Sequence, residues 1–181
     1  MVKGLKQTSS QIVISFGLEE SAANTFTSER VDLQLNALDN EVFVVTGVKL
    51  DALPPDVQLS LGDQRTETQA TLSKQDITNA AAQDLSNTSV FAAHTVNIIT
   101  STAIQPSGDT AYNSVLQSEG LADAPYHVEY LDIIATPDFF VNIKGIGNAN
   151  PVSCNGKLYG YRARADASTY AALVQSELLS S

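Results

Sequence analysis

The stretch LDNEVFVVTGVKLDALPPD runs from Leu38 to Asp56 and contains the strongest strand signal in the chain. Its middle, VFVVTGVKL, is an apolar run rich in β-branched side chains, which pack well on a pleated surface. The preceding Asp and Asn favour a turn, and Gly47 indicates a bulge or bend. Pro54 and Pro55 end the strand because proline has no N–H to donate. This stretch predicts one long strand without any catalytic side chain beside it.

The segment before it predicts a second strand. In SERVDLQLNAL, apolar Val31, Leu33 and Leu35 alternate with polar residues. Strict alternation indicates a strand with one buried face. With the turn residues between them, the two segments are predicted to form a β-hairpin.

Further strand-like segments follow with turn signals between them, a spacing typical of an antiparallel sandwich or barrel. Each has apolar, β-branched or alternating residues; they lie at 11–16, 57–75, 88–104, 126–135, 137–147 and 156–165. In the segment after Gly62, Thr66, Thr68, Ala70 and Leu72 are predicted to share one face. We count about eight strands. The polar residues 105–125 are interpreted as a long connection with a helical turn near 112–117.

The tail ADASTYAALVQSELLSS predicts the one convincing helix, capped by Asp166 or Ser168. Apolar residues recur along one face of it at helical spacing: Tyr170, Leu173, Val174 and Leu178. The chain therefore divides into an N-terminal extension with the first strand (1–20), a β-sandwich (21–165) and a C-terminal helix (166–181).

Composition restricts the class of function. Among 181 residues, 43% are hydrophobic and 17% are charged, which is enough to build a core. The formal net charge of −10 argues against strong direct binding of nucleic acid, which requires clustered Lys and Arg. No run is long enough to form a transmembrane segment, and no export signal is evident. The single cysteine, Cys154, is predicted to be a buried, unreactive residue.

Candidate catalytic groups do not form a recognisable site. The G-x-G in KGIGNAN (144–150) precedes proline and another strand rather than a helix, so a hairpin turn is favoured over a phosphate cradle. Adjacent Glu19 and Glu20 point to opposite faces of an extended chain and are expected to be solvated. His94 and His127 are too few for a zinc site of known spacing, and His94 is expected to be an exposed or hydrogen-bonded strand residue. The chain is therefore predicted not to be an enzyme.

No cofactor is predicted, and a structural Ca²⁺ is the one ion that loop carboxylates suggest. Asp132 and Asp138 bracket a strand end, and Asp109 lies in SGDT. Calcium prefers such oxygen ligands, but no compact D-x-D-x-D pattern is present.

Two arginines near the end of the last strand have two readings. Alternation in YGYRARAD places Tyr159 and Tyr161 on one face and Arg162 and Arg164 on the other. The arginines either pair with carboxylates of a neighbouring subunit or cover their own sheet.

The two segments ERVDLQLNALDNEVFVVTGVKLDALPPD and FFVNIKGIGNANPVSCNGKLYGYRARADASTYAALVQSELLSS resemble the single jelly-roll capsid proteins of viruses, in particular small capsid-like proteins of aquatic prokaryotic viruses. They cover roughly half of the chain, and the resemblance depends on strand pattern and the terminal helix. It implies an all-β, antiparallel eight-stranded jelly-roll sandwich with a C-terminal helix. Many capsid proteins also have an arginine-rich N-terminal arm, which this chain lacks.

The resemblance implies a structural subunit of a self-assembling viral capsid, located in the virion and otherwise soluble in the cytoplasm when expressed alone. Its partners would be copies of itself and other virion proteins. The expected subunit interface consists of Arg162, Arg164, Tyr170, Leu173, Val174 and Leu178.

The alternative is a carbohydrate- or receptor-binding β-sandwich, such as a virion spike or lectin-like module. Its contact residues would be Tyr112, Tyr126 and Tyr130. The absence of Trp and the aromatic content of 7% argue against it, because such sites are usually built from exposed aromatic rings.

Overall fold

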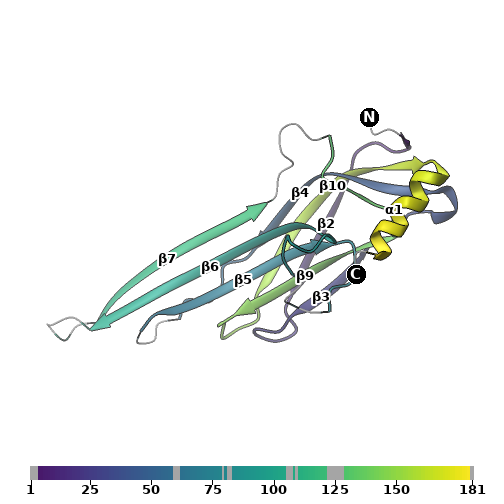
Figure 1. Cartoon of the computed structure of the whole chain (residues 1–181). Helices are drawn as coiled ribbons and strands as arrows, with labels where there is room; N and C mark the ends of the chain where they lie inside the picture. Colours follow the sequence, from purple (N-terminus) through teal and green to yellow (C-terminus); the bar gives the residue numbers. More distant parts are fainter. Residues whose placement is uncertain are drawn as a thin grey trace.

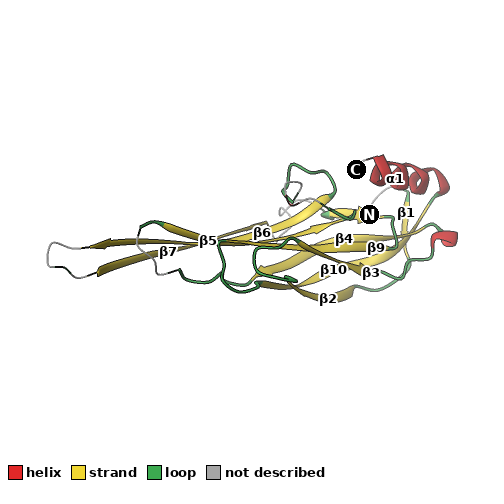
Figure 2. Ribbon diagram, turned by 90° about the horizontal axis from the view of Figure 1, so that it is seen from below, coloured by secondary structure: helices red, strands yellow, loops and turns green. Residues whose placement is uncertain are grey.

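The computed structural model describes residues 4–58, 62–78, 80, 83–104, 108, 110–121 and 129–179. In this part of the chain, two antiparallel β-sheets pack face to face, with one α-helix outside them (Figures 1 and 2). The strands are β1 (Leu5–Gln7), β2 (Ile12–Glu19), β3 (Thr27–Asp32), β4 (Glu41–Ala52), β5 (Gln64–Ser73), β6 (Val90–Ile104), β7 (Thr110–Leu121), β8 (Asp132–Ile134), β9 (Asp138–Ile146) and β10 (Ser153–Ala165). A short 3₁₀ helix, η1 (Ala37–Asp39), precedes β4, and α1 (Ala167–Leu179) follows β10.

The strand order is that of a jelly roll. Sheet A has the order β2–β10–β4–β8, with β1 also beside β10, and sheet B has the order β3–β9–β5–β6–β7. The antiparallel pairs β2–β10, β3–β9, β4–β8 and β5–β6 describe one long hairpin whose successive pairs alternate between the sheets. The predicted antiparallel jelly-roll sandwich with a C-terminal helix is thus confirmed. The predicted count of eight strands is wrong, because the described residues form ten, with β1 and β7 as additions.

The predicted hairpin between the second and third strand segments is also wrong. Strands β3 and β4 lie in different sheets, and β3 ends at Asp32. The chain then turns at Gln34, whose φ of 54° is left-handed, and passes through η1. The apolar face of this segment is nevertheless in the core as predicted, with Leu33 buried and Val31 and Leu35 packed against it.

Strand β4 explains the apolar run that the sequence presented, because both of its faces are buried. Phe43 and Val45 point into the core between the sheets, while Val42 and Val44 point to the opposite face. A register shift opposite Tyr159 and Gly160 leaves Thr46 as an extra residue in β4. After this bulge the pattern reverses, so that the even-numbered Val48, Leu50 and Ala52 line the core. The bend predicted near Gly47 is therefore a β-bulge.

The core between the sheets is built from alternate residues of facing strands. Thr66, Thr68, Ala70 and Leu72 are all buried, which confirms the predicted face of β5. Phe139 lies at the centre and makes edge-to-face contacts with Phe16 at 5.8 Å and Phe91 at 6.4 Å between ring centroids. Glu67, Thr71 and Ser73 on the other face of β5 are buried as well, so this central strand is covered on both sides, and its core face joins the two sheets into one sandwich.

Strand β7 overturns the interpretation of 105–125 as a polar connection with a helical turn. Thr110–Leu121 pairs along β6 without a break in register, from Ile104–Thr110 to Ala93–Leu121. Strands β6 and β7 extend beyond the body of the sandwich at the end opposite α1 (Figures 1 and 2). Strand β7 is rich in Ser, Asn and Gln, so its composition gave little strand signal.

Candidate interaction surfaces

Helix α1 covers the outer face of sheet A and creates a second small core. Buried residues of the sheet form its floor: Leu5, Val42, Val44, Ile133, Ala135, Ala163 and Ala165. Tyr170, Leu173 and Val174, three of the predicted interface residues, pack on this floor. Leu178 belongs to α1, but its side chain lies outside the described part of the structure. The predicted apolar face of the helix is thus used within the chain.

Two carboxylates hold α1 at its ends. Asp166 is the N-cap, as predicted, and its Oδ1 accepts the N–H of Thr169 at 2.7 Å, which lowers the pKa of Asp166. Near the other end, Glu177 is 3% exposed and accepts the N–H groups of Ala135 at 2.8 Å and Thr136 at 3.0 Å. Burial raises the pKa of Glu177 despite these bonds. A buried carboxylate therefore fastens the helix to the loop between β8 and β9.

Both predicted interface arginines have partners in their own chain. Arg162 Nη2 donates to the carbonyl of Leu33 at 3.0 Å. Arg164 forms an ion pair with Asp39, and its Nε donates to the Asp39 carbonyl at 3.1 Å. Both arginines thus make contacts within their own subunit, which is the second of the two alternatives given above.

Glu20 corrects the expectation of a solvated glutamate pair. It is buried, whereas Glu19 is exposed. Its carboxylate accepts the N–H groups of Gly145 and Val152, the latter at 3.1 Å, and so fastens β2 to the loop between β9 and β10. A Cβ on Gly145 would lie 3.0 Å from this carboxylate. The hairpin turn predicted at the G-x-G is wrong, because β9 and β10 lie in different sheets. Gly145 lies within β9, and Gly147 follows the end of that strand in the connection between the two sheets.

The carboxylates considered for calcium are occupied by basic side chains. Asp132 pairs with Lys74 at 3.0 Å, and Asp138 pairs with Arg30 at 3.5 Å. Burial raises the pKa of Asp138, an effect that Arg30 opposes. Asp109 lies outside the described residues. The described part of the chain contains no group of three or more His, Cys, Asp or Glu side chains able to hold a metal ion.

His94 is hydrogen-bonded within the sandwich, and Cys154 is buried in its core. His94 Nδ1 accepts the N–H of Ala52 at 2.9 Å, and Nε2 lies 3.0 Å from Ser118 Oγ, which confirms a hydrogen-bonded strand histidine. Its partner in the zinc argument, His127, lies outside the described residues. Cys154 is buried in the main core, and burial raises its pKa to about 12. Its thiol is therefore protonated at neutral pH.

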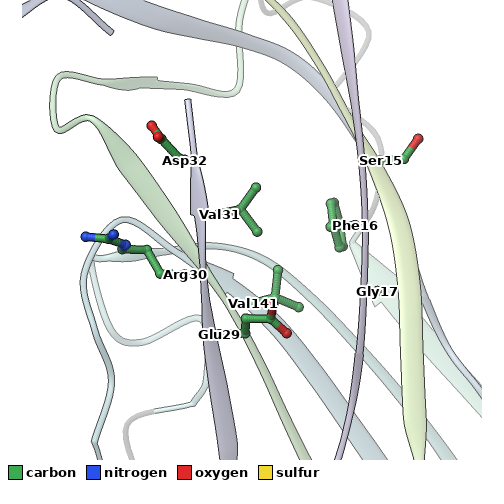
Figure 3. A pocket seen from close by; sticks show the side chains of 8 residues that line it. All are labelled: Ser15, Phe16, Gly17, Glu29, Arg30, Val31, Asp32 and Val141. Atoms are coloured by element: carbon green, nitrogen blue, oxygen red, sulfur yellow. The ribbon is translucent and has the colours of Figure 1, made fainter. Parts of the chain in front are cut away.

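A shallow hollow of about 290 Å³ opens between the edge strands of the two sheets (Figure 3). Phe16 of β2 and Val31 of β3 point toward each other across it, and Val141 of β9 lies at its base. Arg30 and Asp32 point away from it. The hollow thus has a mixed lining, with apolar side chains at its centre and polar residues, including Ser15 and Glu29, around them.

The β6–β7 hairpin exposes apolar side chains on both of its faces, and the sequence argument missed them. Four of its apolar side chains are exposed: Ile99 at 38%, Tyr112 at 57%, Val115 at 49% and Leu116 at 62%. Strand β7 has a hydrogen-bonded neighbour on one side only, β6, within the described residues. Of the tyrosines considered for glycan binding, Tyr112 lies on this hairpin, Tyr130 packs in the second core and Tyr126 is outside the described residues.

Comparison with known protein families found no match, and comparison with curated proteins found none either. No helix among the described residues is long and apolar enough to cross a membrane.

Proposed function

We propose that the chain is a structural subunit that assembles with copies of itself into a closed shell of the viral capsid type. A jelly roll by itself hosts shells, lectins and enzymes, so the proposal depends on the surface as well as the fold. The observation that carries it is the β6–β7 hairpin, which projects from the sandwich and exposes apolar side chains on an unpaired edge strand.

Two further features support this reading. The first strands and the C-terminal helix are fastened to the sandwich, since β1 and β2 pair with β10 and α1 packs on sheet A. These segments thus belong to the folded body of the subunit. The exposed apolar side chains of the hairpin are also a typical sign of a protein–protein contact.

The test is the mass of the purified chain in solution. Light scattering on a size-exclusion column should show species far above the 19.2 kDa of one chain, and negative-stain images should show closed particles. A monomer at every concentration and salt condition would refute the proposal for the isolated chain. The carbohydrate- or receptor-binding module would then be the better proposal, with the hollow between β2 and β3 as the first surface to screen.

A further inference from the structure

Strand β7 is an edge strand without the usual protection against pairing. Natural edge strands are shortened or interrupted, or they carry lysine, proline or a bulge. Strand β7 has twelve residues, no lysine, arginine or proline, and a single charged side chain, Glu119. Its register with β6 is continuous, so no bulge twists the edge away. Its outer edge is therefore suited to main-chain pairing with another strand.

The tip of the hairpin also lacks a third strand. Strand β5 reaches β6 only as far as the pair Gln64–Thr100. Beyond it, Ser101–Ile104 has β7 as its one strand neighbour in the described structure. A two-stranded ribbon is marginally stable in water, whereas a third strand stabilises it.

We infer that β7 pairs antiparallel with β7 of a second copy, about a two-fold axis that passes beside Val115. This inference rests on the proposed self-assembly and names its contact. With Val115 on the axis, Thr110 of one copy lies opposite Gly120 of the other, and every residue between them also has a partner. The two five-stranded B sheets would then continue into each other through β7.

The side chains of this arrangement suit a second copy. Ile99 and Val115 are directly opposite each other on one face of the hairpin, and both are exposed. The axis places Val115 beside Val115 of the second copy, which creates a continuous apolar row from Ile99 to Ile99. Neighbouring strands bring such side chains to within about 5.5 Å.

The charge of β7 is compatible with a second copy at this edge, because Glu119 is its single charged side chain. Two chains of net charge −10 repel each other, and because salt screens charges more than about 8 Å apart, the charges at the contact itself matter most. The axis at Val115 places Glu119 opposite Ala111 of the second copy, so like charges do not meet. It also places Asn113 opposite Gln117, where amide side chains can exchange hydrogen bonds across the strands.

The test is disulfide trapping with the full chain. In Val115→Cys the two thiols would be directly opposite, within the Cα separation of about 4.4–6.8 Å that a disulfide needs. Mild oxidation should give a covalent dimer on non-reducing electrophoresis. The wild type is the background control, because its one cysteine, Cys154, is buried. Val13→Cys is the matched control, since Val13 is also a valine on an edge strand and is also 49% exposed.

A register test makes the trapping specific. Asn113→Cys alone would place the two thiols about 13 Å apart along the strands, too far to bridge. A mixture of Asn113→Cys and Gln117→Cys should cross-link, because those positions face each other. Cross-linking of Asn113→Cys alone, or of Val13→Cys as strongly as Val115→Cys, would overturn the inference.

A charge variant separates this inference from the proposed function. Val115→Lys would place two lysines side by side at the axis and should abolish the dimer, whereas Val13→Lys should leave it unchanged. Particles of the wild type without a Val115→Cys cross-link would overturn the β7 contact and leave the shell proposal standing. A cross-linked dimer that never forms larger species would support the contact and refute the shell.

Discussion

Replacing Glu177 by alanine should destabilise the protein by about 2–4 kcal/mol, because this carboxylate fastens α1 to the loop between β8 and β9. The carboxylate is 3% exposed and is the acceptor for the N–H groups of Ala135 and Thr136. Each buried donor left without a partner costs about 1–3 kcal/mol. Removing the charge also relieves its desolvation, which is the cause of the raised pKa of Glu177. The expected loss of about 2–4 kcal/mol is therefore in the lower part of the range of about 2–6 kcal/mol that two unpaired donors would give.

Urea unfolding followed by tyrosine fluorescence is the appropriate assay. The chain has no tryptophan, and three of its six tyrosines lie in the second core beneath and around α1: Tyr130, Tyr161 and Tyr170. In thermal unfolding followed by the same signal, this loss of stability should lower the melting temperature by roughly 5–12 °C for a domain of this size. Gln175→Ala is the matched control, because Gln175 is exposed on the same helix and its replacement should change stability by less than about 0.5 kcal/mol. A loss for Glu177→Ala no larger than that of the control would refute the view that Glu177 fastens α1.

Three further predictions concern Gly160, Cys154 and the pH dependence of the Glu177 contact. Gly160→Ala should cost about 1–3 kcal/mol in thermal or urea unfolding, because its Cβ would lie 2.4 Å from the carbonyl oxygen of Val44; Gly17→Ala, whose nearest contact is 3.5 Å, should be tolerated, and equal losses would contradict the packing argument. Cys154 should be inert to a thiol reagent such as DTNB at pH 8 in the folded protein and react fully in denaturant, because burial raises its pKa to about 12; rapid labelling of the native chain would show that the core around it is open. The raised pKa of Glu177 means that the folded state holds the proton of this carboxyl group more tightly than the unfolded state does. The resulting contribution to the free energy of unfolding is fully present below the unfolded pKa and is lost as pH rises through the folded pKa. The stability of the wild type relative to Glu177→Gln should therefore fall as pH rises from about 4 to 7, and a rise would show that the N–H bonds outweigh desolvation.

The interface predictions show how far helical spacing alone can be interpreted. The spacing of Tyr170, Leu173 and Val174 correctly indicated one apolar face, and Asp166 correctly indicated the cap. Spacing does not indicate which surface receives that face. In the structure, the receiving surface is the outer side of sheet A, built from strands distant in sequence.

Two buried carboxylates and one strand were not predictable for a similar reason. Glu20 was expected to be solvated, and no sequence pattern indicated that Glu177 is buried. Each carboxylate accepts a backbone N–H group from a loop more than 40 residues away in the chain. Strand β7 is polar and is stabilised by pairing along β6 rather than by burial of its own side chains. The pattern of neighbouring residues in the sequence does not indicate these hydrogen bonds or this strand pairing.

The sequence by itself determined the class of the protein: antiparallel strands with one apolar face, their breaks at proline and turn residues, and a terminal helix. Side-chain periodicity is a local property, so it can be read from neighbouring residues. Only the tertiary structure decided which sheet each strand joins, why β4 is apolar on both faces, and which edge is left unpaired. These depend on contacts between distant segments, since the Thr46 bulge and the docking of α1 determine which side of a strand is buried.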